Sequence, residues 1–165
     1  ELNNQGIECH LAIETSGHAA FKENNFLDDG AYLTAKILIK LAKLNDEGKN
    51  IEDLLEGYKE PKESKEIRLR ITADSRKKYT DKIIKDIEAH SENTENWEQV
   101  KENYEGIRVN CAYKDGKGWF LLRSSLHEPI ICINIESNFQ DGTDLIAKEV
   151  MDILKNYKEI EMAEI

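Results

Sequence analysis

Hydrophobic and polar residues alternate at the start of the chain and then change to a helical spacing. Apolar side chains occupy every second position from Ile7 to Ile13, which predicts a strand over residues 6–13. A polar loop follows. From Ala31 to Ala42 apolar residues recur on one helical face, and Asp29 just before them is a suitable N-cap, so a helix is predicted here.

A charged segment divides the chain. Asn50 is a suitable N-cap for a short helix that carries Ile51, Leu54 and Leu55. The sequence then reads GYKEPKESK, which is polar, contains a proline and is typical of a linker. We therefore predict one domain over residues 1–56, a linker over 57–65 and a second domain over 66–165.

The second domain shows strand and helix patterns in turn. Strand patterns cover residues 67–71, 107–113, 119–123 and 130–136, and helix patterns run from Asp74 or Ser75 to His90 and from Thr143 to Tyr157. The segment Asp115-Gly116-Lys117-Gly118 supplies a hairpin turn. The order strand, helix, three strands, helix predicts an α+β fold, in which a four-stranded antiparallel sheet carries helices on one face.

Composition narrows the classes of protein. With 39% hydrophobic and 34% charged residues the chain is typical of a globular protein, and no apolar stretch approaches the roughly 20 residues of a membrane span. The formal charge of −10 repels nucleic acid and anionic lipid. We therefore expect neither nucleic acid nor a membrane as partner. A phosphorylated metabolite, held by a local cluster of donors, fits better.

The three cysteines are Cys9, Cys111 and Cys132, an odd number without C-x-x-C spacing. This pattern predicts buried thiols in a reducing cytoplasm rather than a disulfide framework. The chain starts at Glu1 without Met or a signal peptide, which leads us to expect a fragment of a longer gene product.

Two loops carry residues suited to binding a ligand. Glu14-Thr15-Ser16-Gly17-His18 follows a strand and combines a carboxylate, two hydroxyls and an imidazole, which together suit the hydroxyls of a sugar. Arg123-Ser124-Ser125-Leu126-His127-Glu128-Pro129 joins two strands and offers a guanidinium, two hydroxyls and backbone amides to a phosphate. Each could instead be an ordinary polar loop, with Arg123 paired to Glu128 in the second.

In this order the two loops resemble a known family. ETSGH followed by AFKENNFLDDGAYLTAKILIKL is similar to the end of the third domain of α-D-phosphohexomutases, the phosphoglucomutase and phosphomannomutase superfamily, whose sugar loop reads G-E-x-S-G-H. GWFLLRSSLHEPIICINIES resembles the fourth domain's phosphate loop, R-x-S-G-T-E-P or R-x-S-N-T-x-P. The chain departs from these motifs at Ile13, where the family has Gly, at Leu126, where it has Gly or Asn, and at His127, where it has Thr.

The resemblance implies a C-terminal fragment, with a strand-loop-helix remnant of an α/β third domain followed by the fourth. It implies that Glu14 and Ser16 hold sugar hydroxyls and that His18 lies near the reacting oxygen. It also implies binding of the phosphate that is not transferred, by Arg123, Ser124, Ser125 and His127.

Family members are intramolecular phosphotransferases that interconvert hexose 1-phosphate and hexose 6-phosphate through a phosphoserine and a bisphosphorylated intermediate. The serine loop and the Mg²⁺-binding D-x-D-x-D loop belong to N-terminal domains, and neither motif occurs in this chain. Asp28 and Asp29 are adjacent, so helix capping explains them better than an octahedral ion. We therefore expect a cytoplasmic parent enzyme that uses Mg²⁺, and a fragment that is inactive alone, binds no metal itself and works with the parent's N-terminal domains on a hexose phosphate.

Three alternatives remain open. The parent could be a phosphoglucosamine or phosphopentose mutase of the same superfamily, since neither Thr15 nor Leu126 decides the sugar. The second domain could be a non-catalytic phosphate-binding module that docks a protein or a nucleotide. An α+β nucleic-acid-binding domain is disfavoured by the acidic charge.

Overall fold

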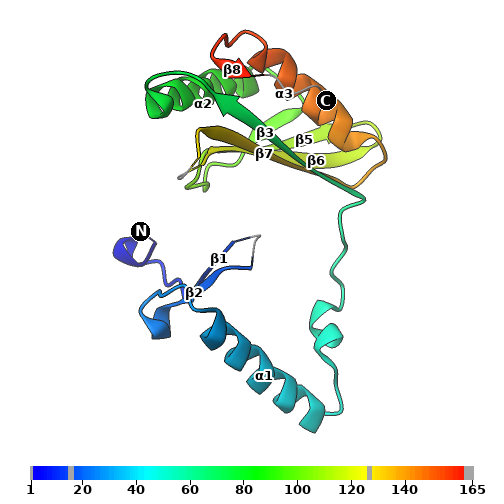
Figure 1. Ribbon diagram of the computed structural model, residues 1–165. Coiled ribbons are helices and arrows are strands. Elements are labelled where there is room, and N and C mark those ends of the chain that lie inside the picture. Colours follow the sequence, from blue (N-terminus) through cyan, green and yellow to red (C-terminus); the bar gives the residue numbers. More distant parts are fainter. Residues whose placement is uncertain (1, 15–16, 126–127, 162–165) are drawn as a thin grey trace. The chain divides into compact units, whose positions relative to one another are not determined.

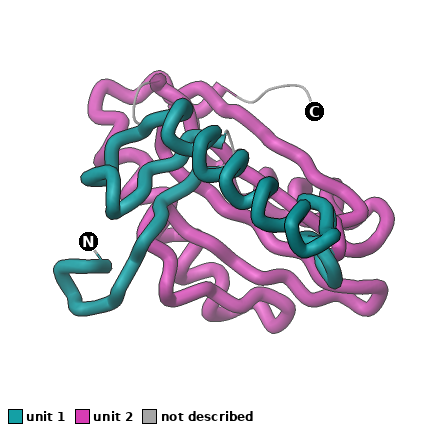
Figure 2. The backbone as a smooth tube through the Cα atoms, turned by 90° about the horizontal axis from the view of Figure 1, so that it is seen from below, with its two compact units in different colours: residues 1–58 teal, residues 59–165 magenta. Residues whose placement is uncertain are grey.

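A computed structural model describes residues 2–14, 17–125 and 128–161. The chain divides into two compact units, residues 1–58 (unit 1) and residues 59–165 (unit 2), which Figure 2 shows in different colours. No helix in the described ranges is long and apolar enough to cross a membrane.

Unit 1 consists of short elements and one longer helix (Figure 1). In chain order they are η1 (Leu2–Gln5), β1 (Leu11–Ile13), β2 (Ala19–Phe21), η2 (Lys22–Asn24), α1 (Gly30–Asp46) and η3 (Ile51–Leu55). The strands β1 and β2 pair in antiparallel fashion, with Ile13 opposite Ala19. The loop between them therefore closes a β-hairpin.

The strand predicted over residues 6–13 is shorter than expected. Only Leu11–Ile13 are in β1. The side chain of Asn3 donates to the carbonyl oxygen of Cys9 and accepts from its amide, each at 3.0 Å. Because a side chain satisfies both backbone groups of Cys9, this residue has no need of a neighbouring strand.

The predicted helix starts in unit 1 are confirmed. The carboxylate of Asp29 accepts from the backbone amide of Tyr32 at 3.0 Å, and this bond lowers the pKa of Asp29. At η3 the backbone amide of Asn50 donates to the carboxylate of Asp53 at 2.8 Å. Both helices therefore begin where their capping residues predict.

Unit 2 is an antiparallel sheet covered by two helices. Its elements are β3 (Glu63–Ile71), α2 (Arg76–Glu92), β4 (Trp97–Gln99), β5 (Ile107–Tyr113), β6 (Gly116–Ser124), β7 (Ile130–Ser137), α3 (Gly142–Leu154) and β8 (Ile160–Glu161). The strand order is β4-β5-β6-β7-β3-β8, and α2 and α3 lie on the same face of the sheet (Figure 1). This confirms the predicted α+β class with helices on one face.

The sheet is larger than predicted: it has six strands, whereas four were expected. The strands β4 and β8 contain three and two residues, so neither is long enough to show an alternating pattern. The strand β3 starts at Glu63, four residues before the predicted Ile67, because polar residues there pair with β7. The helix α3 ends at Leu154, before the predicted Tyr157.

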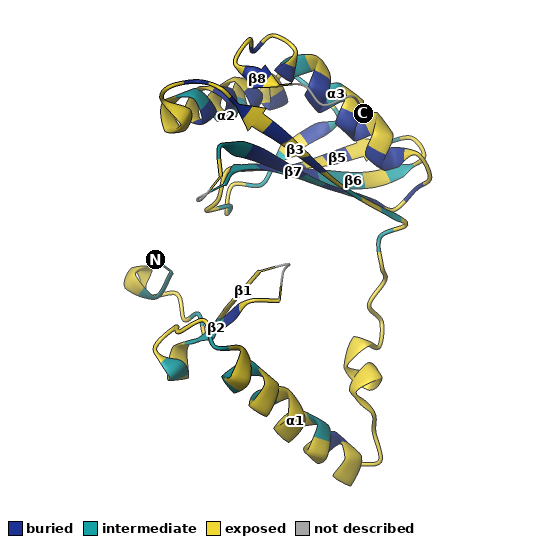
Figure 3. Cartoon of the chain, in the orientation of Figure 1, coloured by how far each residue is buried: buried dark blue, intermediate teal, exposed yellow. Residues whose placement is uncertain are grey.

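The core of unit 2 lies between the sheet and the helices (Figure 3). Alternate residues of β6 and β7 are fully buried there, among them Phe120, Leu122, Ile131 and Ile133. They pack with apolar residues of α2 and α3, such as Ile83 and Val150. Among the described residues of unit 2 no helix lies on the opposite face of the sheet, and we call it the open face.

The thiols of Cys111 and Cys132 are buried and free, as predicted, but Cys9 is only half-buried, so that part of the prediction was wrong. Burial raises the pKa of Cys111 to about 12 and also raises the pKa of Cys132. Cys9 lies in unit 1, where few residues are available to cover it.

Candidate phosphate and sugar loops

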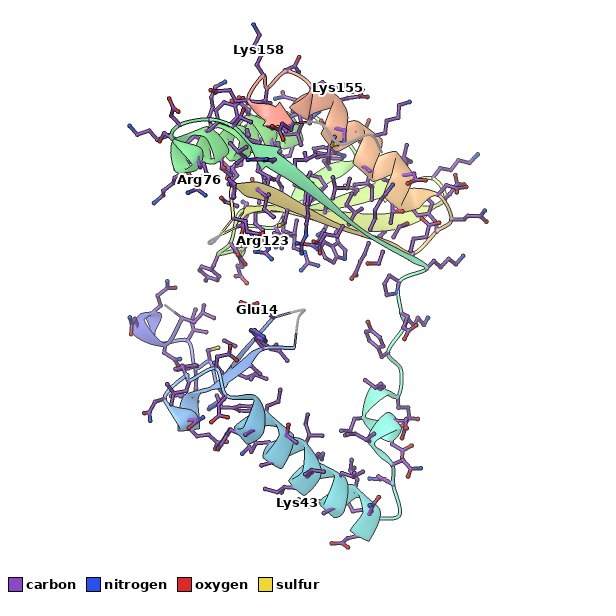
Figure 4. The ribbon with its side chains drawn as sticks, in the orientation of Figure 1. Glu14, Lys43, Arg76, Arg123, Lys155 and Lys158 are labelled. Atoms are coloured by element: carbon purple, nitrogen blue, oxygen red, sulfur yellow. The ribbon has the colours of Figure 1, made fainter. Side chains whose placement is uncertain are left out.

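The guanidinium of Arg123 lies on the open face of the sheet. Its neighbours Phe120 and Leu122 in β6 are buried on the helix side, and strand side chains alternate between faces. Figure 4 shows Arg123 on the side of the sheet away from α2 and α3. The residue therefore lies outside the core, at the end of β6 that enters the predicted phosphate loop.

The ion pair of Arg123 differs from the one considered as the structural alternative. Its Nη1 donates to Oε1 of Glu105 at 3.2 Å, whereas Glu128 was the suggested partner. The side chain of Arg123 is 33% exposed and that of Glu105 59% exposed. A pair so open to water contributes little to stability, so a stronger anion can replace Glu105 at low cost.

Ser125 forms hydrogen bonds with residues on the other side of the predicted phosphate loop. Its backbone amide donates to the carbonyl of Ile130 at 3.0 Å, and its hydroxyl accepts from the amide of Glu128 at 3.2 Å. The hydroxyl of Ser124 donates to the carbonyl of Ser125 at 3.4 Å. Leu126 and His127 lie outside the described residues. Ser125 follows directly on the last residue of β6, two positions after Arg123.

Glu14 and His18 face each other across the β1–β2 hairpin of unit 1. The amide of Glu14 donates to the carbonyl of His18, and the amide of Gly17 donates to the carbonyl of Glu14, both at 2.9 Å. Gly17 has a φ of +88°, which glycine adopts at little cost. Ser16, the third predicted sugar ligand, lies outside the described residues. Glu14 and His18 are both exposed and so are accessible to a ligand.

His18 has a carboxylate partner that the sequence pattern did not predict. Its Nδ1 lies 3.2 Å from Oδ2 of Asp28, and both side chains are more than half exposed. Asp28 is thus directed to the imidazole while its neighbour Asp29 caps α1. The two carboxylates do not converge, so they do not fit a magnesium site. Within the described ranges no group of three or more His, Cys, Asp or Glu side chains could hold a metal ion.

Further arginines lie on the open face, outside the two predicted loops. The chain has five arginines, and the four on this face are Arg68, Arg70, Arg108 and Arg123. The fifth, Arg76, begins α2. The signal was present in the segment I-R-L-R-I, because residues between core positions of a strand must point to the other face.

Comparisons with known proteins agree with the resemblance of the two loops. No family model matches the chain. It is 32% identical over 132 residues to a phosphomannomutase/phosphoglucomutase from Pseudomonas syringae pv. tomato. The aligned segment covers 79% of this chain and 25% of that protein. A phosphomannomutase/phosphoglucomutase from Pseudomonas aeruginosa is 27% identical over 146 residues, or 88% of this chain and 28% of that protein.

A solved structure shows the same likeness in three dimensions. The crystal structure of a phosphoglucomutase/phosphomannomutase family protein from Burkholderia thailandensis matches with a TM-score of 0.60 and 28% identity, over 94% of this chain and 29% of that one. The chain spans about a quarter of the length of the curated relatives it matches. In sequence and in structure, the chain is therefore related to the phosphoglucomutase/phosphomannomutase family.

Proposed function

We propose that this chain is the sugar- and phosphate-binding C-terminal part of a mutase that interconverts hexose 1-phosphate and hexose 6-phosphate, with glucose or mannose as the sugar. The observation that carries the proposal is the guanidinium of Arg123 on the open face of the sheet, two residues before Ser125, whose hydroxyl accepts from the amide of Glu128. A guanidinium with a hydroxyl close to it in the chain suits a phosphate dianion. The names of the relatives supply the reaction class.

In this proposal the two loops position the substrate. Glu14 accepts hydrogen bonds from sugar hydroxyls, Ser16 forms a hydrogen bond with a further hydroxyl, and His18 lies near the reacting oxygen. Arg123, Ser124, Ser125 and His127 bind the phosphate that is not transferred. Phosphoryl transfer depends largely on position and on stabilisation of charge, so fixing one end of the sugar phosphate contributes directly to the rate.

The chemistry itself is assigned to the remainder of the enzyme. A bisphosphorylated intermediate has to turn round between the two half-reactions, and the Arg123 loop can bind either of its phosphates. The phosphoserine and the Mg²⁺ that supports transfer are proposed to belong to the other domains of a cytoplasmic enzyme. Asp28 and Asp29 have other partners, so no step at a metal is assigned to this chain.

Binding to the 165-residue chain tests the proposal directly. Glucose 6-phosphate, mannose 6-phosphate and the two unphosphorylated sugars are titrated against wild type and Arg123→Lys, with amide chemical shifts as the readout. Lysine keeps the charge but loses the planar fork, so we expect Kd for the phosphorylated sugars to rise about tenfold or more. Arg76→Lys, on α2 and away from the open face, is the matched control.

The outcomes distinguish a phosphate-binding role of Arg123 from a structural role. Unchanged phosphate affinity in Arg123→Lys, together with a lower Tm, would make Arg123 a structural residue and would overturn the proposal. Equal binding of phosphorylated and unphosphorylated sugars would also contradict it. A panel on the full-length enzyme that includes glucosamine and pentose phosphates then decides between the hexose mutase and its phosphoglucosamine and phosphopentose alternatives.

A further inference from the structure

We propose that the phosphate site extends from β6 to β3, where Arg68 and Arg70 add two guanidinium groups to that of Arg123 for the same phosphate ester. This inference rests on the proposed phosphate site at Arg123 and adds residues to it. The ligand class is a phosphate monoester dianion bound over β7, between the arginine of β6 and the arginines of β3.

The register of the sheet places these residues in adjacent rows on the open face. Arg123 lies opposite Cys132 of β7, and Cys132 lies opposite Arg68 of β3. In the next row Ser125 donates through its amide to Ile130, which lies opposite Arg70. Neighbouring strands are about 4.8 Å apart, so β6 and β3 lie roughly 10 Å apart with only β7 between them. Arginine side chains from both strands can therefore meet over β7.

Arg68 and Arg123 act on common neighbours. The pKa of Glu66 is lowered first by the hydrogen bond from Arg68, and the positive charge of Arg123 lowers it further. The pKa of Cys132 is raised by burial, while Arg123 and Arg68 both oppose that shift. Both guanidinium groups therefore contribute to the field between β6 and β3, where the carboxylates of Glu66 and Glu128 oppose them.

The end of β3 is also tied to the predicted phosphate loop. The amide of Ile71 donates to the carbonyl of Pro129 at 2.7 Å, so β3 and the loop end at the same edge of the sheet. Arg70 is exposed, and it forms no ion pair with any residue in the described part of the chain. It thus offers a free guanidinium beside the loop that carries Ser125.

Each of the other two guanidinium groups of the proposed site pairs with a carboxylate. Glu66 pairs with Arg68, and Glu105 pairs with Arg123. Glu66 also accepts a hydrogen bond from the side-chain amide of Asn134 at 3.2 Å. This bond holds the carboxylate of Glu66 on the open face. A phosphate dianion that reaches these arginines must displace the carboxylates. The affinity for phosphate should therefore rise when the Glu66 carboxylate is removed.

The test uses substitutions that weaken and strengthen binding at the same site. Inorganic phosphate and glucose 6-phosphate are titrated against the 165-residue chain, with amide chemical shifts as the readout. We expect Arg68→Lys combined with Arg70→Lys to raise Kd at least fivefold at unchanged net charge, and Glu66→Gln to lower Kd at least twofold. Arg76→Lys is the control for arginine replacement, and melting curves verify that each variant is folded.

The results distinguish this inference from the proposed function. If Arg123→Lys weakens phosphate binding while the β3 variant and Glu66→Gln leave it unchanged, the loop alone is the site and the extension to β3 is wrong. If the β3 variant weakens binding but Arg123→Lys does not, the phosphate loop assigned above is wrong, and so is a site shared between the two strands. Phosphate affinities that do not change in any variant would overturn both proposals.

Discussion

Unit 2 has a closed hydrophobic core, whereas the described residues of unit 1 bury almost nothing. Phe120 and Leu69 in unit 2 are 0% exposed. In unit 1, within residues 2–14 and 17–58, only Ala19 and Leu44 are buried, while Leu38 and Ile39 of α1 are 59% and 54% exposed. A helix in a protein is stabilised mainly by the packing of its apolar face. Unit 2 therefore carries its own stability, and unit 1 contributes little.

The largest effect should come from the centre of unit 2. Phe120→Ala removes a fully buried ring that stacks edge-on against Trp97, with ring centroids 5.0 Å apart. We expect a loss of roughly 3–5 kcal/mol in the free energy of unfolding. Urea unfolding followed by tryptophan fluorescence measures this, because both tryptophans, Trp97 and Trp119, lie in unit 2.

Leu44→Ala is the matched change in unit 1, since Leu44 is also buried. It should leave the fluorescence-detected urea midpoint unchanged, because the reporters belong to a unit that folds by itself. An equal shift of the midpoint in both variants would show that the two units unfold together, and the comparison would be wrong.

A glycine pair offers a second contrast. Gly106 in unit 2 has a φ of +66°, and an added Cβ would come within 2.0 Å of the backbone oxygen of Leu122. Gly48 in unit 1 has a φ of +71° but nothing within 4 Å of that position. We expect Gly106→Ala to cost roughly 1–3 kcal/mol in the same urea measurement, from backbone strain and from overlap. Gly48→Ala should not move the unit 2 midpoint, and a comparable shift there would contradict the separation.

The parts of the fold that were predictable are those with a strong local signal. Alternation of Ile67, Leu69 and Ile71 predicts β3, and the side chain of Asp29 predicts the start of α1. The edge strands β4 and β8 were missed because three and two residues carry no period, and they pair only once the rest of the sheet exists. Short edge strands are therefore set by tertiary structure.

The candidate site was predictable in its loops but not in its neighbours. Arg123 and Ser125 stand in one motif, so the sequence places them together. Glu105, which binds Arg123, is 18 residues earlier, and Arg68 is joined to the site only through the pairing of β3 with β7. Partners brought together by strand register cannot be read from local spacing.

A smaller effect should come from the N-terminus of α3. The carboxylate of Glu63 accepts from the backbone amides of Asp141 at 2.6 Å and of Thr143 at 3.1 Å. Both bonds lower the pKa of Glu63, and the bond from Thr143 has the larger effect. A carboxyl whose pKa is lowered by folding stabilises the folded state at pH values above the ordinary glutamate pKa of about 4.3. This stabilisation is lost as the pH falls through the pKa of the folded state. Glu63→Gln should therefore reduce Tm by a few degrees at neutral pH.

Melting curves at several pH values check this expectation. The difference in Tm between wild type and Glu63→Gln should shrink as the pH falls below about 4. Glu60→Gln, an exposed glutamate three residues earlier, is the control and should melt like wild type throughout. A Tm difference that is the same at neutral and acid pH would mean that the charge of Glu63 does not stabilise α3.

The smallest effect on stability should come from the exposed face of α1. Leu38→Glu replaces one of three consecutive exposed apolar residues, Ile37, Leu38 and Ile39. Because the side chain is already 59% exposed, the free energy of unfolding of unit 2 should change by less than about 0.5 kcal/mol. Binding of a hydrophobic fluorescent dye should fall, because contiguous exposed apolar residues provide the dye site. Leu145→Glu on α3 is the matched control, since Leu145 is 38% exposed in unit 2. It should leave dye binding unchanged, and a destabilised unit 2 in Leu38→Glu would show instead that α1 supports the core.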